Sequence, residues 1–186
     1  MIDHCGRSID YLRISITDRC NLRCVYCMPE GGVQSFRHED VLNYEEIVRV
    51  VRQAAALGVK HLRVTGGEPM ARKGCLELVD MLHHISGIET ISMTTNALLL
   101  DGRVEEAKAK GLTALNVSMD SVDAETFRAM TRGGNVNVVL RVIDEALAAG
   151  LTVGGKACGK SFAIDSSTSV VRTAAMVLHF FHNIPE

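Results

Sequence analysis

The chain has 186 residues, and its 20 basic and 22 acidic side chains give a formal net charge of −2 at pH 7 with histidine neutral. That balance provides no electrostatic case for binding nucleic acid or an anionic membrane surface. The chain has no tryptophan and only 4% aromatic residues, which argues against base-stacking platforms.

Hydrophobic residues make up 47% of the chain, enough for the core of one domain or of one domain with an appendage. No apolar run approaches the roughly 18 residues that a membrane span needs. Residues 1–7 are polar and contain no apolar signal-peptide core, so we expect no secretion. The cytoplasm and the mitochondrial matrix both remain open as compartments.

The first predicted element is a strand at residues 11–17, in which apolar and polar residues alternate with a period of two. Directly after it, in a predicted loop, three cysteines follow one another with three and then two residues between them: Cys20, Cys24 and Cys27. The other three cysteines show no such spacing, and we expect them to be incidental: Cys5, Cys75 and Cys158.

Thiolates are soft ligands that suit zinc and iron–sulfur clusters. Three thiolates close a cubane cluster only partly and leave one iron open to an exogenous ligand. An open metal position is typical of chemistry rather than of a structural site. The spacing alone leaves two alternatives open: a zinc knuckle with a fourth ligand elsewhere, and three unrelated thiols.

Further along the chain, short strand-like segments alternate with helical patterns. Asn43 is a predicted N-cap, and the helix that follows it ends near Gly58. The remaining strands are predicted at residues 61–65, 90–96 and 114–120, and the remaining helices at 76–84, 104–110, 123–130 and 139–150. Four strand–helix units in succession predict an α/β fold with a parallel sheet, either open or curled into a partial barrel.

The two faces of the predicted strands differ in polarity. One set is apolar and should pack under the helices: Leu12, Ile14, Ile16, Leu62, Val64, Ile91, Met93, Leu115, Val117 and Met119. The alternate set is polar: Arg13, Ser15, Thr17, Arg63, Thr65, Ser92, Thr94, Asn96, Asn116, Ser118 and Asp120. A packed barrel interior is filled with branched apolar residues, so we expect a polar ligand to occupy this face.

Two arginines, Arg13 and Arg63, lie in mid-strand on the polar face. Guanidinium groups match phosphate and carboxylate geometry, so the ligand is predicted to be an anion. The alternative is that these arginines pair with Asp120 or another acid on the same face.

Three motifs in order resemble the radical S-adenosylmethionine (SAM) superfamily: the cysteine triplet with Tyr26, then Thr65-Gly-Gly-Glu-Pro69, then Asn116-Val-Ser-Met-Asp120. From about Gly6 to about Leu151 the chain resembles the GTP 3′,8-cyclase family of molybdenum cofactor (molybdopterin) biosynthesis, most clearly from Asp10 to Glu30.

The resemblance implies a role for nine residues. A 4Fe-4S cluster would be held by Cys20, Cys24 and Cys27. SAM would bind the open iron and contact Tyr26, Gly67 and Ser118. GTP would contact Arg13, Arg63 and Thr94.

The implied activity is that of a lyase. An electron donor reduces the cluster, SAM yields a 5′-deoxyadenosyl radical, and GTP becomes 3′,8-cyclo-7,8-dihydro-GTP. The protein would hold the substrate near the radical and exclude water.

The family pattern ends near residue 151. We therefore predict a partial radical SAM core at residues 1–153 and an atypical tail at 154–186. The family's three further cysteines for a second cluster are missing, and Lys156 lies near the family's GTP-binding lysine but out of register with it. Residues 154–161 match the Walker A spacing, but residues 151–153 look too short for the strand that this motif requires.

The tail leaves several interpretations open. Residues 170–181 form either a short helix or a disordered segment, and the missing strands would leave an exposed sheet edge. The chain is accordingly predicted to be a truncated, impaired enzyme. A non-catalytic isoform that binds a second copy or a full-length enzyme is the alternative, and a zinc module is the third.

Overall fold

The computed structural model describes residues 4, 6, 8–29, 31–32, 36–157 and 160–164. Its centre is one sheet in the order β1-β2-β3-β4-β5-β6. Five strands run parallel: β1 (Tyr11–Ser15), β2 (His61–Thr65), β3 (Thr90–Thr95), β4 (Ala114–Ser118) and β5 (Thr152–Ala157). The sixth strand, β6 (Lys160–Ile164), pairs antiparallel with β5.

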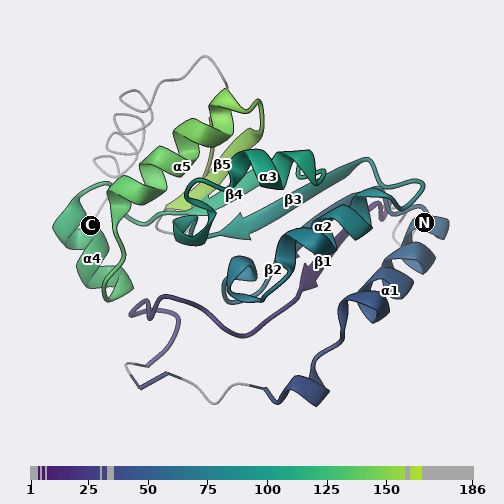
Figure 1. The fold of residues 1–186 in the computed structure, drawn as a ribbon, viewed down its shortest axis with the longest axis horizontal. Helices are drawn as coiled ribbons and strands as arrows, with labels where there is room; N and C mark the ends of the chain where they lie inside the picture. The colour runs from purple at the N-terminus through teal and green to yellow at the C-terminus, as the bar shows by residue number, and fades with distance from the viewer. Residues whose placement is uncertain are drawn as a thin grey trace.

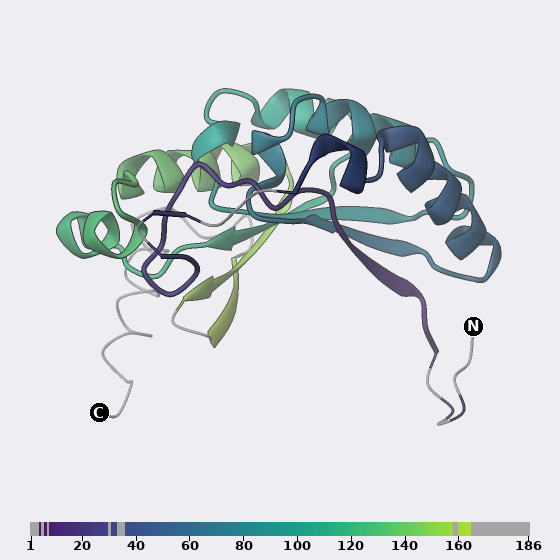
Figure 2. The same ribbon diagram turned by 90° about the horizontal axis from the view of Figure 1, so that it is seen from below.

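Helices connect the parallel strands and cover one face of the sheet (Figures 1 and 2). The α-helices are α1 (Tyr44–Ala56), α2 (Cys75–His83), α3 (Val104–Ala109), α4 (Ala124–Thr131) and α5 (Val136–Ala148). Three short 3-10 helices complete the connections: η1 (His38–Asp40), η2 (Pro69–Ala71) and η3 (Leu98–Leu100). The predicted α/β fold with a partial parallel sheet is confirmed.

Helices α1 to α4 begin within one residue of the predicted starts, whereas α5 begins at Val136, three residues before the predicted start at 139. Asn43 caps α1, because its side chain accepts from the Glu46 amide at 2.8 Å while the Glu46 carboxylate accepts from the Asn43 amide at 2.8 Å. Asp123 caps α4, because its side chain accepts from the Thr126 amide. These caps satisfy amides that have no partner inside a helix, and so they fix where each helix starts.

The predicted difference between the two sheet faces is confirmed for β2, β3 and β4. Their apolar residues, such as Val64, Met93 and Val117, are buried under the helices. The alternate residues, such as Arg63, Thr94 and Ser118, are only partly buried, except for Thr65 at the end of β2, which is buried. Figure 2 shows the helices on one side of these strands. Within the part of the chain that the structure describes, no helix covers the polar face.

The fifth strand differs from what the sequence suggests. Residues 151–153 look too short for a strand, yet β5 runs from Thr152 to Ala157 because parallel pairing with β4 satisfies its backbone groups. The next described segment, residues 160–164, is the antiparallel strand β6 rather than the helix that a Walker A loop requires.

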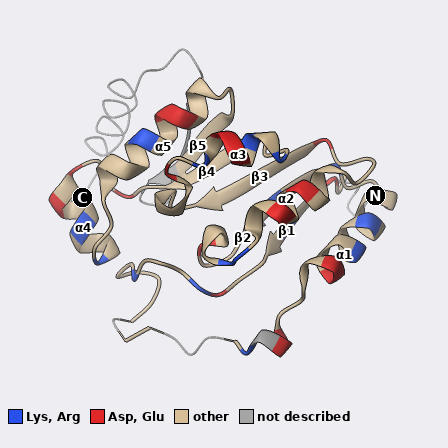
Figure 3. Ribbon diagram, viewed as in Figure 1, with Lys and Arg blue, Asp and Glu red and all other residues tan. Residues whose placement is uncertain are grey.

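Charges of both signs are interspersed along the helices (Figure 3), in keeping with the balanced composition. Within the described ranges, no helix is long and apolar enough to cross a membrane. Cys5, Cys158 and the predicted helix at residues 170–181 lie outside the described residues. The division at residue 153 stays a prediction, and β5 crosses it.

Candidate functional site

The cysteine triplet lies in the long connection between β1 and α1. In Figure 1 this segment leaves the tip of β1, runs towards α4 and returns to α1. Cys20 and Cys24 are partly buried, Cys27 is exposed, and all three thiols are free. The segment starts at the carboxyl end of β1, and parallel sheets place their active sites at that edge.

The turn after β2 forms backbone hydrogen bonds with the start of this segment. The Gly67 amide donates to the Thr17 carbonyl at 2.7 Å, and the Glu68 amide donates to the Arg19 carbonyl at 2.8 Å. A Cβ on Gly67 would lie 2.7 Å from the Asp18 carbonyl oxygen and closer still to that of Arg19. Only glycine permits this approach, so the turn holds the backbone just ahead of Cys20.

Hydrogen bonds to the Glu68 side chain connect the same turn to the end of β3. Its side chain is fully buried, and its carboxylate accepts from the Met70 amide at 3.1 Å and from the Asn96 amide at 2.8 Å. The Thr95 hydroxyl donates to the same carboxylate at 2.8 Å. Sequence reasoning placed Glu68 inside a motif but did not predict this anchoring role.

Burial raises the pKa of the Glu68 carboxyl above its usual value of 4.5, although the Asn96, Met70 and Thr95 donors oppose that shift. A carboxyl whose pKa is higher in the folded state stabilises the fold below its usual pKa and loses that contribution as pH rises through the folded value. We therefore expect the difference in the free energy of unfolding between the wild type and Glu68→Gln to decrease as pH rises from 4.5 through the raised pKa of Glu68. Urea unfolding of both proteins across this pH range measures the difference, and an advantage that grows with pH would contradict it.

Two side chains connect the cysteine segment to the neighbouring strands. The Asn96 side chain donates to Asn21 Oδ1 at 2.9 Å and lies 3.8 Å from Cys20 Sγ. The Tyr26 hydroxyl donates to Asp120, just past the end of β4. Burial and this hydrogen bond raise the pKa of the Tyr26 phenol above its usual range, so Tyr26 stays protonated.

The three thiols influence one another electrostatically. Burial raises the pKa of Cys24, the neighbouring Tyr26 hydroxyl lowers it, and the charges of Cys27 and Cys20 raise it further. Burial and the charges of Cys20 and Asp120 raise the pKa of Cys27. A bound metal favours the thiolate form and would lower the free-energy cost of deprotonating these thiols.

The end of α4 holds the middle of the cysteine segment. The Val25 amide donates to the Met130 carbonyl at 2.9 Å. Arg132 Nη1 donates to the carbonyls of Arg23 at 2.9 Å and Met28 at 3.0 Å, which flank Cys24 and Cys27. We found no sequence signal that predicts this contact, because it joins residues more than a hundred positions apart.

Replacing Arg132 with methionine is expected to slow iron incorporation by roughly fivefold or more, since two hydrogen bonds worth about 1 kcal/mol each are lost. Iron uptake during anaerobic reconstitution measures this. Arg128→Met, an exposed arginine on the same helix, is the matched control. Equal uptake in both variants would show that Arg132 does not order the segment.

The two predicted anion-binding arginines lie side by side, because Arg13 on β1 is in register with Arg63 on β2. Arg63 stacks 5.5 Å over the Tyr11 ring and donates to Ser92 Oγ at 3.4 Å. Arg13 donates to Thr65 Oγ1 at 3.5 Å. Among the residues that the structure describes, neither arginine has a carboxylate within ion-pair distance.

The predicted site residues therefore fall into two neighbouring groups. Cys20, Cys24, Cys27, Tyr26 and Gly67 belong to the cysteine segment or to the turn that holds it. Arg13, Arg63, Thr94 and Ser118 lie on the polar face of the sheet. Lys156, on β5, is in register with Ser118.

Within the described ranges, no three histidine, cysteine or acidic side chains form a group that could hold one metal ion. A tetrahedral zinc site needs its sulfur atoms about 4 Å apart. A cubane binds each thiolate through a different iron, so its ligands are spaced more widely.

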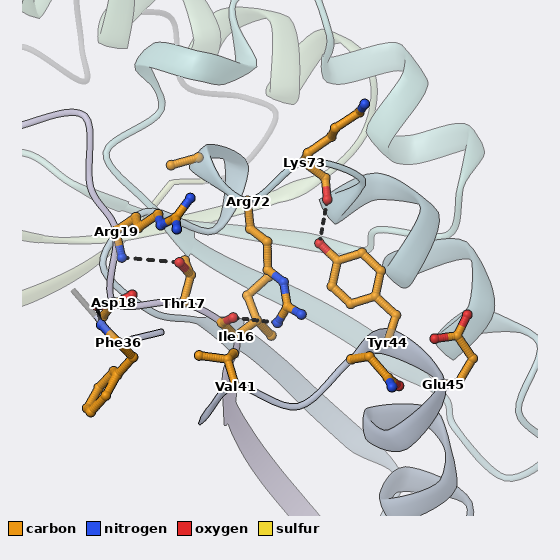
Figure 4. Close-up of a pocket in the computed structure, with 12 residues that line it drawn as sticks. Ile16, Thr17, Asp18, Arg19, Phe36, Val41, Tyr44, Glu45, Arg72 and Lys73 are labelled. Atoms are coloured by element: carbon orange, nitrogen blue, oxygen red, sulfur yellow. Dashed lines mark hydrogen bonds between the residues drawn. The ribbon is translucent and has the colours of Figure 1, made fainter. Parts of the chain in front are cut away.

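A separate pocket of about 470 Å³ lies between the end of β1, η2 and the start of α1 (Figure 4). Arg72 lines it, donating to the Ile16 and Leu42 carbonyls at 2.7 Å and stacking on Tyr44. None of the predicted site residues lines this pocket. Arg72 is thus occupied in joining the loop to the sheet.

Comparison with known proteins connects these observations. The chain is 48% identical over 151 residues to a GTP 3′,8-cyclase of Clostridium botulinum, covering 81% of this chain and 47% of that protein. It is 53% identical to the GTP 3′,8-cyclase of Pelotomaculum thermopropionicum, covering 81% of this chain and 46% of that protein. The chain thus spans about half the length of these relatives.

Solved structures share the fold at low sequence identity. Streptococcus suis SuiB bound to S-adenosylmethionine is 20% identical with a TM-score of 0.65, covering 77% of this chain and 32% of that one. HydG, a maturase of the [FeFe]-hydrogenase, is 19% identical with a TM-score of 0.65, covering 92% of this chain and 38% of that one. The model of the radical SAM superfamily matches residues 14–161. With most of its length inside that match, the chain belongs to the radical SAM superfamily.

Proposed function

We propose that this chain is the radical-generating half of a GTP 3′,8-cyclase, with residues 1–153 as a partial core and 154–186 as a tail. One observation carries the proposal: the segment that bears Cys20, Cys24 and Cys27 is hydrogen-bonded to the turn after β2 and to Arg132, beside a polar sheet face on which Arg13 and Arg63 lie in register. A cluster and an anionic substrate would then be neighbours. The similarity to GTP 3′,8-cyclases supports the choice of reaction.

The residues present fit a 4Fe-4S cluster. Cys20, Cys24 and Cys27 supply three soft thiolates, which leaves one iron for an exogenous ligand. The segment that carries them is held just ahead of Cys20 by the Gly67 turn and around Cys24 and Cys27 by Arg132, so little ordering is needed when the cluster binds. When bound, the cluster and SAM supply one-electron reductive chemistry that ends in abstraction of a hydrogen atom from the substrate.

Three residues are proposed to position SAM. Gly67 lies in the turn just ahead of Cys20, and its exposed backbone is proposed to contact SAM. Tyr26 is held in place by Asp120, and Ser118 offers a hydroxyl from the polar face at the end of β4. Together they would orient SAM over the carboxyl ends of the strands.

Arg13, Arg63 and Thr94 are proposed to bind GTP. The stack on Tyr11 and the bond to Ser92 hold the Arg63 guanidinium in place, which lowers the entropy cost of binding a phosphate. Two adjacent positive charges with no carboxylate partner among the described residues favour a multiply charged anion. Holding the nucleotide here would keep its ribose near the reactive centre and exclude water.

Nucleotide binding tests this part of the proposal. Equilibrium dialysis with GTP should show at least a tenfold loss of affinity in Arg63→Met, because one desolvated charge-assisted contact is worth roughly 1.5–3 kcal/mol. Arg52→Met, an exposed arginine on α1, should bind GTP as the wild type does. Equal affinity in the two variants would contradict the assignment of Arg63.

A second candidate function is that of a non-catalytic module that binds a second copy or a full-length enzyme. Strand β1 stands at one end of the described strand order, and an edge strand can pair with a strand of another chain. That function predicts copurification with a longer chain that survives Cys24→Ser, whereas the first predicts catalysis that this substitution abolishes. An external electron donor is part of the first proposal only.

A further inference from the structure

The side chain of Asn96 lies directly against one of the proposed cluster ligands. Asn96 follows β3 and is only 9% exposed. Its Nδ2 atom lies 3.8 Å from Cys20 Sγ and 2.9 Å from Asn21 Oδ1. The Leu22 amide also donates to Cys20 Sγ, at 3.4 Å, so this sulfur has two N–H donors.

The surrounding contacts fix which end of the Asn96 amide faces the sulfur. Its Oδ1 accepts from the Leu98 amide at 3.1 Å, and its backbone amide donates to Glu68 Oε2 at 2.8 Å. Turning the side-chain amide over would set its nitrogen against the Leu98 N–H and its oxygen against Asn21 Oδ1. The nitrogen must therefore point towards Cys20.

An N–H group that donates to a ligating sulfur changes how easily the cluster is reduced. Reduction adds negative charge that is shared with the thiolates, and a hydrogen-bond donor stabilises that charge. Hydrogen bonds to the sulfurs are among the factors that set the potential of iron–sulfur clusters. In a partly buried site the effect is larger than in water.

We propose that Asn96 is a positioning residue that donates an N–H···S hydrogen bond to Cys20 and so raises the reduction potential of the cluster. This inference rests on the proposed function, in which Cys20, Cys24 and Cys27 hold the cluster. Glu68 supports it indirectly, by fixing the Asn96 backbone.

An EPR-monitored redox titration of the reconstituted, SAM-free full chain tests the proposal. Asn96→Asp keeps an acceptor for the Leu98 amide but replaces the donor, and Asn96→Ala removes the donor without adding charge. Both should be harder to reduce, by about tenfold in the equilibrium constant or about 59 mV for one electron. Asn137→Asp makes the same chemical change at an exposed site on α5 and should leave the potential unchanged.

The outcomes separate this inference from the function on which it rests. If Asn96→Ala loads iron fully and keeps the wild-type potential, the inference is wrong, whatever Asn96→Asp does. If the wild type itself binds no cluster, the proposed function fails and the inference with it.

If the Asn96 variants bind no iron, a measurement on the wild-type protein still tests the inference. Pulsed EPR of the reduced wild type, labelled with 15N only in asparagine side chains, should detect a nitrogen coupled to the cluster. The absence of that coupling would overturn the inference.

Discussion

Glu68→Ala is expected to lower the free energy of unfolding by roughly 3 kcal/mol or more and to abolish stable cluster binding. The substitution leaves the Met70 and Asn96 amides without an acceptor in a buried place, and each such group costs about 1–3 kcal/mol. It also releases the turn that fastens the backbone ahead of Cys20. Urea unfolding and iron content after reconstitution measure the two effects.

Glu68→Gln distinguishes the effect of losing side-chain volume from the effect of losing hydrogen-bond acceptors. Glutamine fills the same space, but one carboxylate oxygen becomes an NH2 group that faces a donor, so we expect an intermediate loss of roughly 1–3 kcal/mol. If Glu68→Ala unfolds at the same urea concentration as the wild type, the anchoring role of Glu68 is wrong.

Gly67→Ala is expected to reduce iron loading severely, with a loss of stability of roughly 1–3 kcal/mol. The new methyl group would meet the carbonyl oxygens of Asp18 and Arg19, and backbone atoms cannot move aside as a flexible side chain can. The segment must shift away from the turn, which displaces Cys20. Iron and sulfide analysis after reconstitution gives the loading.

Gly31→Ala is the matched control, because a methyl group there would meet nothing within 4 Å. We expect it to load iron as the wild type does. A Gly67→Ala protein with the same iron content as Gly31→Ala would show that the turn and the cysteine segment are not tightly coupled.

Much of the fold could be predicted from local patterns. The period-two alternation of β2 to β4 predicted which residues lie under the helices, since one face of each strand is buried against apolar groups. Asn43 and Asp123 predicted helix starts, because a cap needs only residues close in sequence. Strand β5 escaped prediction, since its existence depends on pairing with β4 rather than on its own glycine-rich sequence.

The site was less accessible to sequence reasoning. The cysteine spacing indicated a metal or cluster, and the alternation placed Arg13 and Arg63 on one face. The contacts of Arg132, Asp120 and Asn96 with the cysteine segment join distant parts of the chain, so no local pattern contains them. The specific reaction followed only from the similarity to a family.

Anaerobic iron–sulfur reconstitution followed by a SAM cleavage assay with dithionite tests the central claim most directly. We predict about four iron and four sulfide per chain, and formation of 5′-deoxyadenosine that is lost in Cys24→Ser. Such a result would establish that this half of the barrel seats both the cluster and SAM. A chain that binds stoichiometric zinc instead, or that holds a cluster but leaves SAM intact, would contradict the account.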